Sequence, residues 1–119
     1  MFATPWEKFQ RATITLARSG PIKDRLTDAY RNHLARVTDE DLPPELREEF
    51  RALRRELTCE RPLLPGEDAF RATVRKMSVE RAEALSCSVV KIFCALPRTL
   101  TSARSKSPAE VVPLRAAEA

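Results

Sequence analysis

The candidate catalytic or metal-binding side chains in this 119-residue chain are one histidine and three cysteines. These are the residue types best suited to nucleophilic catalysis, acid–base catalysis or metal binding. A catalytic thiol needs a histidine beside it, and a metal site needs several donors at short, regular spacing. No CxxC motif relates Cys59, Cys87 and Cys94, and no second histidine accompanies His33. No glycine-rich phosphate loop is present either. The sequence therefore indicates no catalytic residue, metal, cofactor or small-molecule ligand, and we expect a protein that is not an enzyme.

His33 falls within the apolar stripe of a helix expected over residues 21–37. We expect a core histidine whose ring is hydrogen-bonded to a backbone carbonyl or a neighbouring side chain. The alternative hypothesis is an enzyme centred on His33 as a buried acid–base group. A general base needs a partner and a cleft, and the sequence identifies no partner for this histidine.

Apolar periodicity predicts the elements that carry these residues. Only two glycines occur, and the nine prolines lie between apolar-periodic segments, which disfavours sheets and favours helices. Five helices are expected, and the last four cover residues 21–37, 44–58, 67–77 and 78–96. The first begins at Thr4, which forms a capping box with Glu7. The sequence thus predicts a single all-α domain over residues 1–97, followed by a disordered basic tail over residues 98–119.

The segment 78–96 is the most apolar of the five, and we expect the others to surround it. Cys87, Val90 and Cys94 widen its apolar face to more than half of the circumference. A helix that is apolar nearly all round must be buried, so its cysteines should behave as small hydrophobic side chains. This predicts a bundle-like or orthogonal array with a central C-terminal helix. Leu63 and Leu64, in the preceding connection, are expected to pack back on the core.

Charge and composition indicate the cellular compartment in which the protein is expected. The formal net charge is +4, and no apolar run approaches the roughly 20 residues that cross a membrane. An odd number of cysteines argues against a disulfide framework, and the N-terminus does not resemble a secretory signal. Arginine outnumbers lysine by about three to one, which suggests a GC-rich genome. We therefore expect a bacterial cytoplasmic protein with no membrane contact.

Two surfaces are candidates for binding a protein partner. The helix over residues 44–58 separates its charges, with glutamates on one flank and four arginines on the other: Arg47, Arg51, Arg54 and Arg55. A solvated helix with internal ion pairs explains this pattern, and partner selection by the arginine flank is the alternative. The second candidate is a strip on the helix 78–96, made by Ala84, Ser88, Lys91 and Ala95. We favour an intramolecular helix contact for this strip over a two-fold contact between subunits.

A basic cluster supplies the remaining hypothesis. Arg71, Arg75 and Lys76 would contact the phosphates of a nucleic acid. A helix-turn-helix is disfavoured because the recognition helix would be the most apolar segment of the chain. Our leading hypothesis is accordingly a small non-enzymatic interaction or regulatory protein that acts through helix faces, with a homodimer among the options. A nucleic-acid-binding accessory protein is the second hypothesis.

Overall fold

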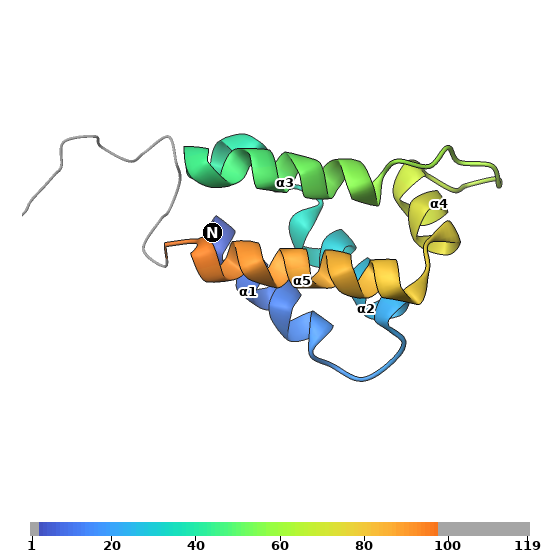
Figure 1. Ribbon diagram of the computed structural model, residues 1–119, viewed down its shortest axis with the longest axis horizontal. Coiled ribbons are helices and arrows are strands. Elements are labelled where there is room, and N and C mark those ends of the chain that lie inside the picture. The colour runs from blue at the N-terminus through green and yellow to red at the C-terminus, as the bar shows by residue number, and fades with distance from the viewer. Residues whose placement is uncertain (1–2, 98–119) are drawn as a thin grey trace, which may run out of the picture.

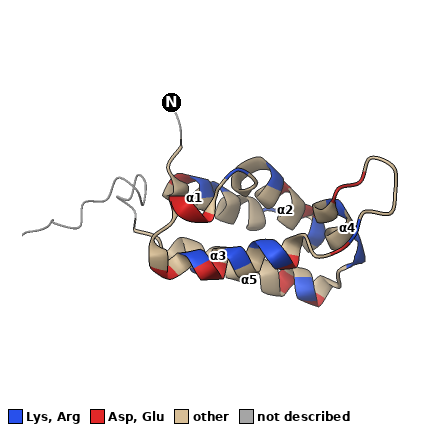
Figure 2. Cartoon of the chain, turned by 90° about the horizontal axis from the view of Figure 1, so that it is seen from above, with Lys and Arg blue, Asp and Glu red and all other residues tan. Residues whose placement is uncertain are grey.

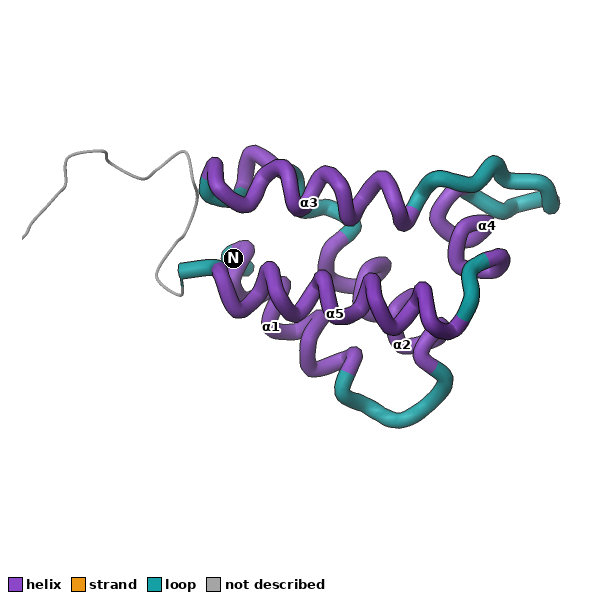
Figure 3. Tube along the Cα trace, viewed as in Figure 1, coloured by secondary structure: helices purple, strands orange, loops and turns teal. Residues whose placement is uncertain are grey.

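The computed structural model describes residues 3–97, and this part of the chain is helical without strands (Figures 1 and 3). The five α-helices within it are α1 (Pro5–Leu16), α2 (Ile22–Ala29), α3 (Pro44–Leu57), α4 (Ala69–Lys76) and α5 (Val79–Ala95). Two short turns are the π-helix η1 (Tyr30–Leu34) and the 3₁₀-helix η2 (Asp39–Asp41). The predicted all-α fold is confirmed. The predicted tail, residues 98–119, lies outside the described residues.

The arrangement of the helices makes α5 the central element. α3 and α5 run antiparallel to one another, and α4 joins them across one end of the molecule (Figure 1). α5 contacts α1 and α2 as well as α3, so three helices meet on this last one. None of the described helices is long and apolar enough to cross a lipid bilayer.

Side-chain caps explain where three of the helices begin. The Thr4 hydroxyl accepts from the Glu7 N–H at 3.2 Å, and the Glu7 carboxylate accepts from the Thr4 N–H at 3.0 Å. This is the capping box that the sequence predicted. Asp68 accepts from the Arg71 N–H before α4, and Ser78 accepts from the Arg81 N–H before α5. Each cap satisfies a backbone donor that the first turn of a helix leaves without a partner.

The core lies where α5 meets its neighbours. Nine large side chains in it are less than 2% exposed: Phe9, Leu26, Leu34, Val37, Leu42, Phe50, Leu57, Val89 and Ile92. The rings of Phe9 and Phe50 meet edge to face at 5.9 Å and join α1 to α3. Trp6 and Phe93 lie 5.3 Å apart and join α1 to α5. Aromatic pairs in these orientations add to the stabilisation that burial alone provides.

The prediction of one helix over residues 21–37 is wrong in its second half. α2 ends at Ala29, and a π turn follows, in which the Ala35 N–H donates to the Tyr30 carbonyl at 2.8 Å. A π turn accommodates one more residue than an α turn. Leu34 and Val37 remain buried, whereas His33 is displaced to the surface and is only half-buried.

The prediction that α5 is hidden on most sides is also wrong. Its buried side chains are Ala82, Leu85, Ser86, Val89 and Ile92, all on the side that faces α1, α2 and α3. Cys87 and Cys94 are exposed, because α4 stands across the end of α5 and does not cover its outer side (Figure 1). Leu63 and Leu64 are 64% and 53% exposed, so their predicted packing on the core is wrong as well.

Candidate interaction surfaces

The outer face of α5 is not covered by the other described helices. We define it by six residues that point away from the three neighbouring helices: Ala84, Cys87, Ser88, Lys91, Cys94 and Ala95. Ser88 is half-buried, and the other five are exposed. The predicted strip of Ala84, Ser88, Lys91 and Ala95 belongs to this face. No described helix covers it, so the intramolecular contact that we favoured for the strip is wrong, and a contact between subunits stays a prediction.

An apolar groove runs beside the outer face, between α1 and α5. It has a volume of about 440 Å³ and is lined by Thr13, Leu16, Ala17, Ile22, Ser86, Cys87, Val90 and Lys91. Cys87 and Lys91 belong to both surfaces, so the groove and the outer face are continuous. Ile14, which follows the groove residue Thr13 in the sequence of α1, is 53% exposed. Together they form an exposed surface whose side chains are mostly small or apolar.

The arginines of α3 are engaged within the chain, among acidic residues on the same helix (Figure 2). Arg51 pairs with Asp39 at 2.6 Å and with Glu48 at 3.1 Å, while Arg55 lies 3.7 Å from Glu48. The hydrogen bonds that Arg51 donates to Glu48 and then to Asp39 raise the pKa of Arg51 above its usual value. Both arginines are exposed, and such pairs stabilise a fold only slightly.

Two other arginines of this flank satisfy backbone carbonyls. The Arg47 Nε donates to the Leu42 carbonyl at 3.0 Å. Arg54 lies over the Phe50 ring, 4.9 Å from its centroid, and its Nη2 donates to the carbonyl of Val37. That nitrogen also lies 3.4 Å from the Ala35 carbonyl, beyond the end of η1. Arg54 therefore supplies a partner for carbonyls that the end of this turn leaves open. A role of these four arginines in partner choice stays a prediction.

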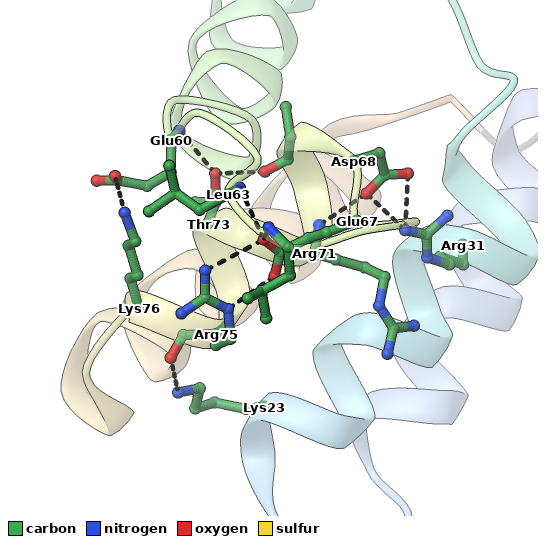
Figure 4. A network of polar contacts seen from close by, with 12 residues as sticks. Lys23, Arg31, Glu60, Leu63, Glu67, Asp68, Arg71, Thr73, Arg75 and Lys76 are labelled. Carbon is green, nitrogen blue, oxygen red and sulfur yellow. Dashed lines mark hydrogen bonds and ion pairs between the residues drawn. The ribbon is translucent and has the colours of Figure 1, made fainter.

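The basic cluster of α4 is largely paired with carboxylates (Figure 4). Arg75 makes two hydrogen bonds to Glu67, with its Nε 2.7 Å from Oε2 and its Nη2 3.1 Å from Oε1. Lys76 lies 3.4 Å from Glu60. The Arg71 side chain forms no ion pair with the described residues. Two of the three positive charges proposed to bind nucleic acid are therefore offset within the fold.

Glu67 anchors the loop in front of α4. Its side chain is 6% exposed, and it accepts from the backbone N–H groups of Leu63 at 3.2 Å and Leu64 at 3.3 Å. The hydrogen bond from Arg75, with smaller contributions from these amides, lowers the pKa of Glu67 to about 2. The carboxylate is thus charged throughout the physiological range and holds the loop against α4.

His33 lines a polar cavity of about 330 Å³ with Thr15, Arg18, Ser19, Arg25, Asp28 and Asn32. The prediction of a core histidine is wrong, because the π turn places the ring at this surface. Desolvation, followed by the charges of Arg11 and Arg18, lowers the pKa of His33 below 6.5. Within residues 3–97, no carboxylate is hydrogen-bonded to the ring, and none of the three cysteines lines its cavity.

Neither a metal site nor a disulfide is found among the described residues. Among the described residues, no group of three or more His, Cys, Asp or Glu side chains lies close enough to hold a metal ion. All three cysteines are exposed free thiols. No family model, curated protein or solved structure matches the chain significantly.

Sequence periodicity alone did not single out Glu83, which is exposed on α5 one turn before Cys87. A signal for it was present in the row of residues four apart that runs from 79 to 95. In that row, Glu83 lies four residues before Cys87 and Lys91 lies four residues after it. The wide apolar face expected for this helix concealed the pattern.

Proposed function

We propose that this chain is a non-enzymatic protein-interaction module whose contact surface is the outer face of α5 together with the adjoining groove. The observation that carries the proposal is the exposure of this surface. Between Ala84 and Ala95 the sequence holds a single charge, Lys91, yet no described helix covers the outer side. Surfaces depleted of charge in this way are characteristic of the centres of protein interfaces.

The shape of the surface favours a helix of a partner protein as its occupant. Small side chains at Ala84, Ser88 and Ala95 allow two helix axes to approach to about 8–10 Å. The groove beside them offers apolar contacts from both α1 and α5. A helix laid against such a surface is a recurring mode of protein recognition.

The other two hypotheses have weaker support. An enzyme centred on His33 would need a group that orients the ring, and no carboxylate among the described residues is hydrogen-bonded to it. A nucleic-acid-binding protein would need free cations, and Arg75 and Lys76 are held by carboxylates. The free thiols and the arginine-rich composition support our expectation of a bacterial cytoplasmic chain.

Affinity capture from the native host tests the proposal. The chain carrying Ala84→Arg and Ala95→Arg, which places two large charges on the outer face, is compared with the unaltered chain. Ala35→Arg, at an exposed alanine outside this face, is the matched control. We expect a bound protein to be retained by the control and lost by the double variant, with equal helix content by circular dichroism in all three. Retention of the same proteins by the double variant would exclude this surface.

A further inference from the structure

The exposed row of α5 has a symmetric order of side-chain types. Residues four apart on a helix form a ridge. The ridge along the outer side of α5 consists of Val79, Glu83, Cys87, Lys91 and Ala95. All five are exposed, and Val79 is 50% exposed. From either end the order is apolar, charged, thiol, charged, apolar, and the two charges are opposite in sign.

The two charges of this ridge have no ion-pair partner within residues 3–97. Neither Glu83 nor Lys91 forms an ion pair with another described residue, because each stands on the uncovered side of α5. Arg81 of the same helix, in contrast, is paired with Glu56 of α3. The ridge therefore presents one acid and one base without an ion-pair partner among the described residues, four residues to either side of Cys87.

We propose that two copies of this chain pair through the ridge, α5 against α5 in antiparallel orientation, with the two-fold axis at Cys87. This inference rests on the proposed function and names the partner as a second copy. In this register Glu83 faces the partner's Lys91, and Lys91 faces the partner's Glu83. Val79 faces the partner's Ala95, which brings apolar side chains together at both ends. Both copies thus use the same surface, as the interface of a two-fold dimer requires.

Charge decides the orientation of the two helices. A parallel pair would place each Glu83 against the partner's Glu83 and each Lys91 against the partner's Lys91. Like charges in contact oppose association, whereas the antiparallel pair contains two opposite-charge contacts. Ala84 and Ser88, which flank the ridge, are small enough to let the two helices approach closely.

The register predicts distances between thiols. For helix axes about 8–10 Å apart and Cα atoms about 2.3 Å from each axis, the two Cys87 Cα atoms lie roughly 3.5–5.5 Å apart. The two Cys94 residues are each seven positions from the two-fold axis, which separates them by about 21 Å along the helices. In a parallel pair, both cysteines would lie close to their counterparts.

Single-cysteine chains test the register by cross-linking. Three variants each keep one thiol: C59S/C94S keeps Cys87, C59S/C87S keeps Cys94, and C87S/C94S keeps Cys59. With a short bismaleimide reagent, we expect a covalent dimer from the Cys87 chain and monomer from the other two, although all three thiols are exposed. Equal cross-linking through Cys87 and Cys94 would overturn the antiparallel orientation.

Charge reversal tests the two ion pairs independently of the thiols. Glu83→Lys and Lys91→Glu each replace two opposite-charge contacts by two like-charge contacts, and we expect the dimer dissociation constant to rise at least about tenfold. The double variant E83K/K91E restores both contacts in reversed sense, so its dissociation constant should return to within about threefold of the original. Sedimentation equilibrium at low salt provides the measurement. Glu49→Lys on α3 and Arg61→Glu in the loop after it are the matched controls.

The outcomes separate this inference from the proposed function. A double variant as weak as the single ones would overturn the charge pairing. A monomeric mass for the unaltered chain at high concentration would overturn the self-pairing. In both cases the capture experiment still decides whether the outer face binds a different protein, because its readout does not depend on a second copy.

Discussion

The hydroxyl of Thr13 makes no hydrogen bond that would explain a polar side chain at this position. Its Oγ1 is buried and has no hydrogen-bond partner among the described residues. The neighbouring Thr15 is buried too, but its hydroxyl donates to the Arg11 carbonyl at 2.9 Å. A buried hydroxyl without a partner costs free energy that a methyl group of similar size does not.

Replacement of Thr13 by valine should therefore stabilise the chain. We expect Thr13→Val to raise the free energy of unfolding by about 1 kcal/mol, since valine and threonine have similar helix propensities. Urea denaturation at pH 7 measures the change. Thr15→Val is the matched control and should give no increase. An unchanged or lower stability for Thr13→Val would show that its hydroxyl does find a partner in solution.

At the scale of residues, the sequence correctly predicted the capping box of α1, but it did not predict which side chains of its helices are exposed. Thr4 precedes α1 with a side chain that is favoured at only a few positions, so its placement follows from local chemistry. His33 and the cysteines are compatible with either side of a helix. Their exposure depends on which neighbours reach them, and that is set by the packing of distant segments.

The segment before α4 is held by one carboxylate, which makes its stability dependent on pH. In the folded chain the pKa of Glu67 is about 2, against 4.5 for the free group. Between these values the unfolded chain binds a proton more readily than the folded chain does, so acid favours unfolding. The stabilisation from Glu67 is complete above pH 4.5 and is lost as the pH falls towards 2.

Glu67→Gln should reduce this dependence. The variant has no charge to titrate, so we expect its stability to fall less steeply between pH 4.5 and pH 2 than that of the unaltered chain. The Arg71 amide and then Arg31 lower the pKa of Asp68. Asp68 therefore contributes part of the pH dependence of stability in both the variant and the unaltered chain. Thermal melts across this range provide the measurement, with Glu49→Gln as the control. Parallel slopes for all three chains would contradict the role of Glu67.

At the scale of elements, the number and order of the α-helices could be predicted, and the π turn could not. The apolar spacing of Leu26, Tyr30, Leu34 and Val37 is satisfied by a continuous α-helix. At the end of the π turn, Arg54, about twenty residues away, donates to backbone carbonyls that the turn leaves open. A long-range partner of that kind leaves no periodic trace in the local sequence.

At the scale of the whole molecule, α5 packs against three other helices. Because these helices depend on the same contacts, we expect the fold to unfold as one unit. Ile92, on the buried side of α5, is 0% exposed. We expect Ile92→Ala to lower the free energy of unfolding by about 2–5 kcal/mol, a large part of the roughly 5–15 kcal/mol typical of a domain.

Two probes at one protein concentration check this prediction. Trp6 fluorescence reports the contact between α1 and α5, and far-ultraviolet circular dichroism reports all helices. Their transitions should coincide and shift together in the variant. Leu63→Ala, at a 64% exposed position, is the control and should change the stability by less than about 0.5 kcal/mol. Separate transitions would show that the helices unfold independently.

The architecture was predictable at this scale because one segment was markedly more apolar than the rest. That α5 contacts several helices follows from its hydrophobicity. Which side would remain uncovered does not follow, since the number of neighbours is limited by the short α4 and by the connections between helices. The candidate surface, including Glu83 and Cys87, is therefore visible only once the packing is known.

The position of α5 has a consequence for synthesis on the ribosome. α1, α2 and α3 emerge before the 17-residue helix on which all three pack. At about 5–20 residues per second, making that helix takes roughly 1–4 s. During this interval the nascent chain carries Phe9, Leu26 and Leu53 without their final cover. Cells that translate slowly through codons 79–95 would prolong that interval and lose more of the product to proteases and chaperones.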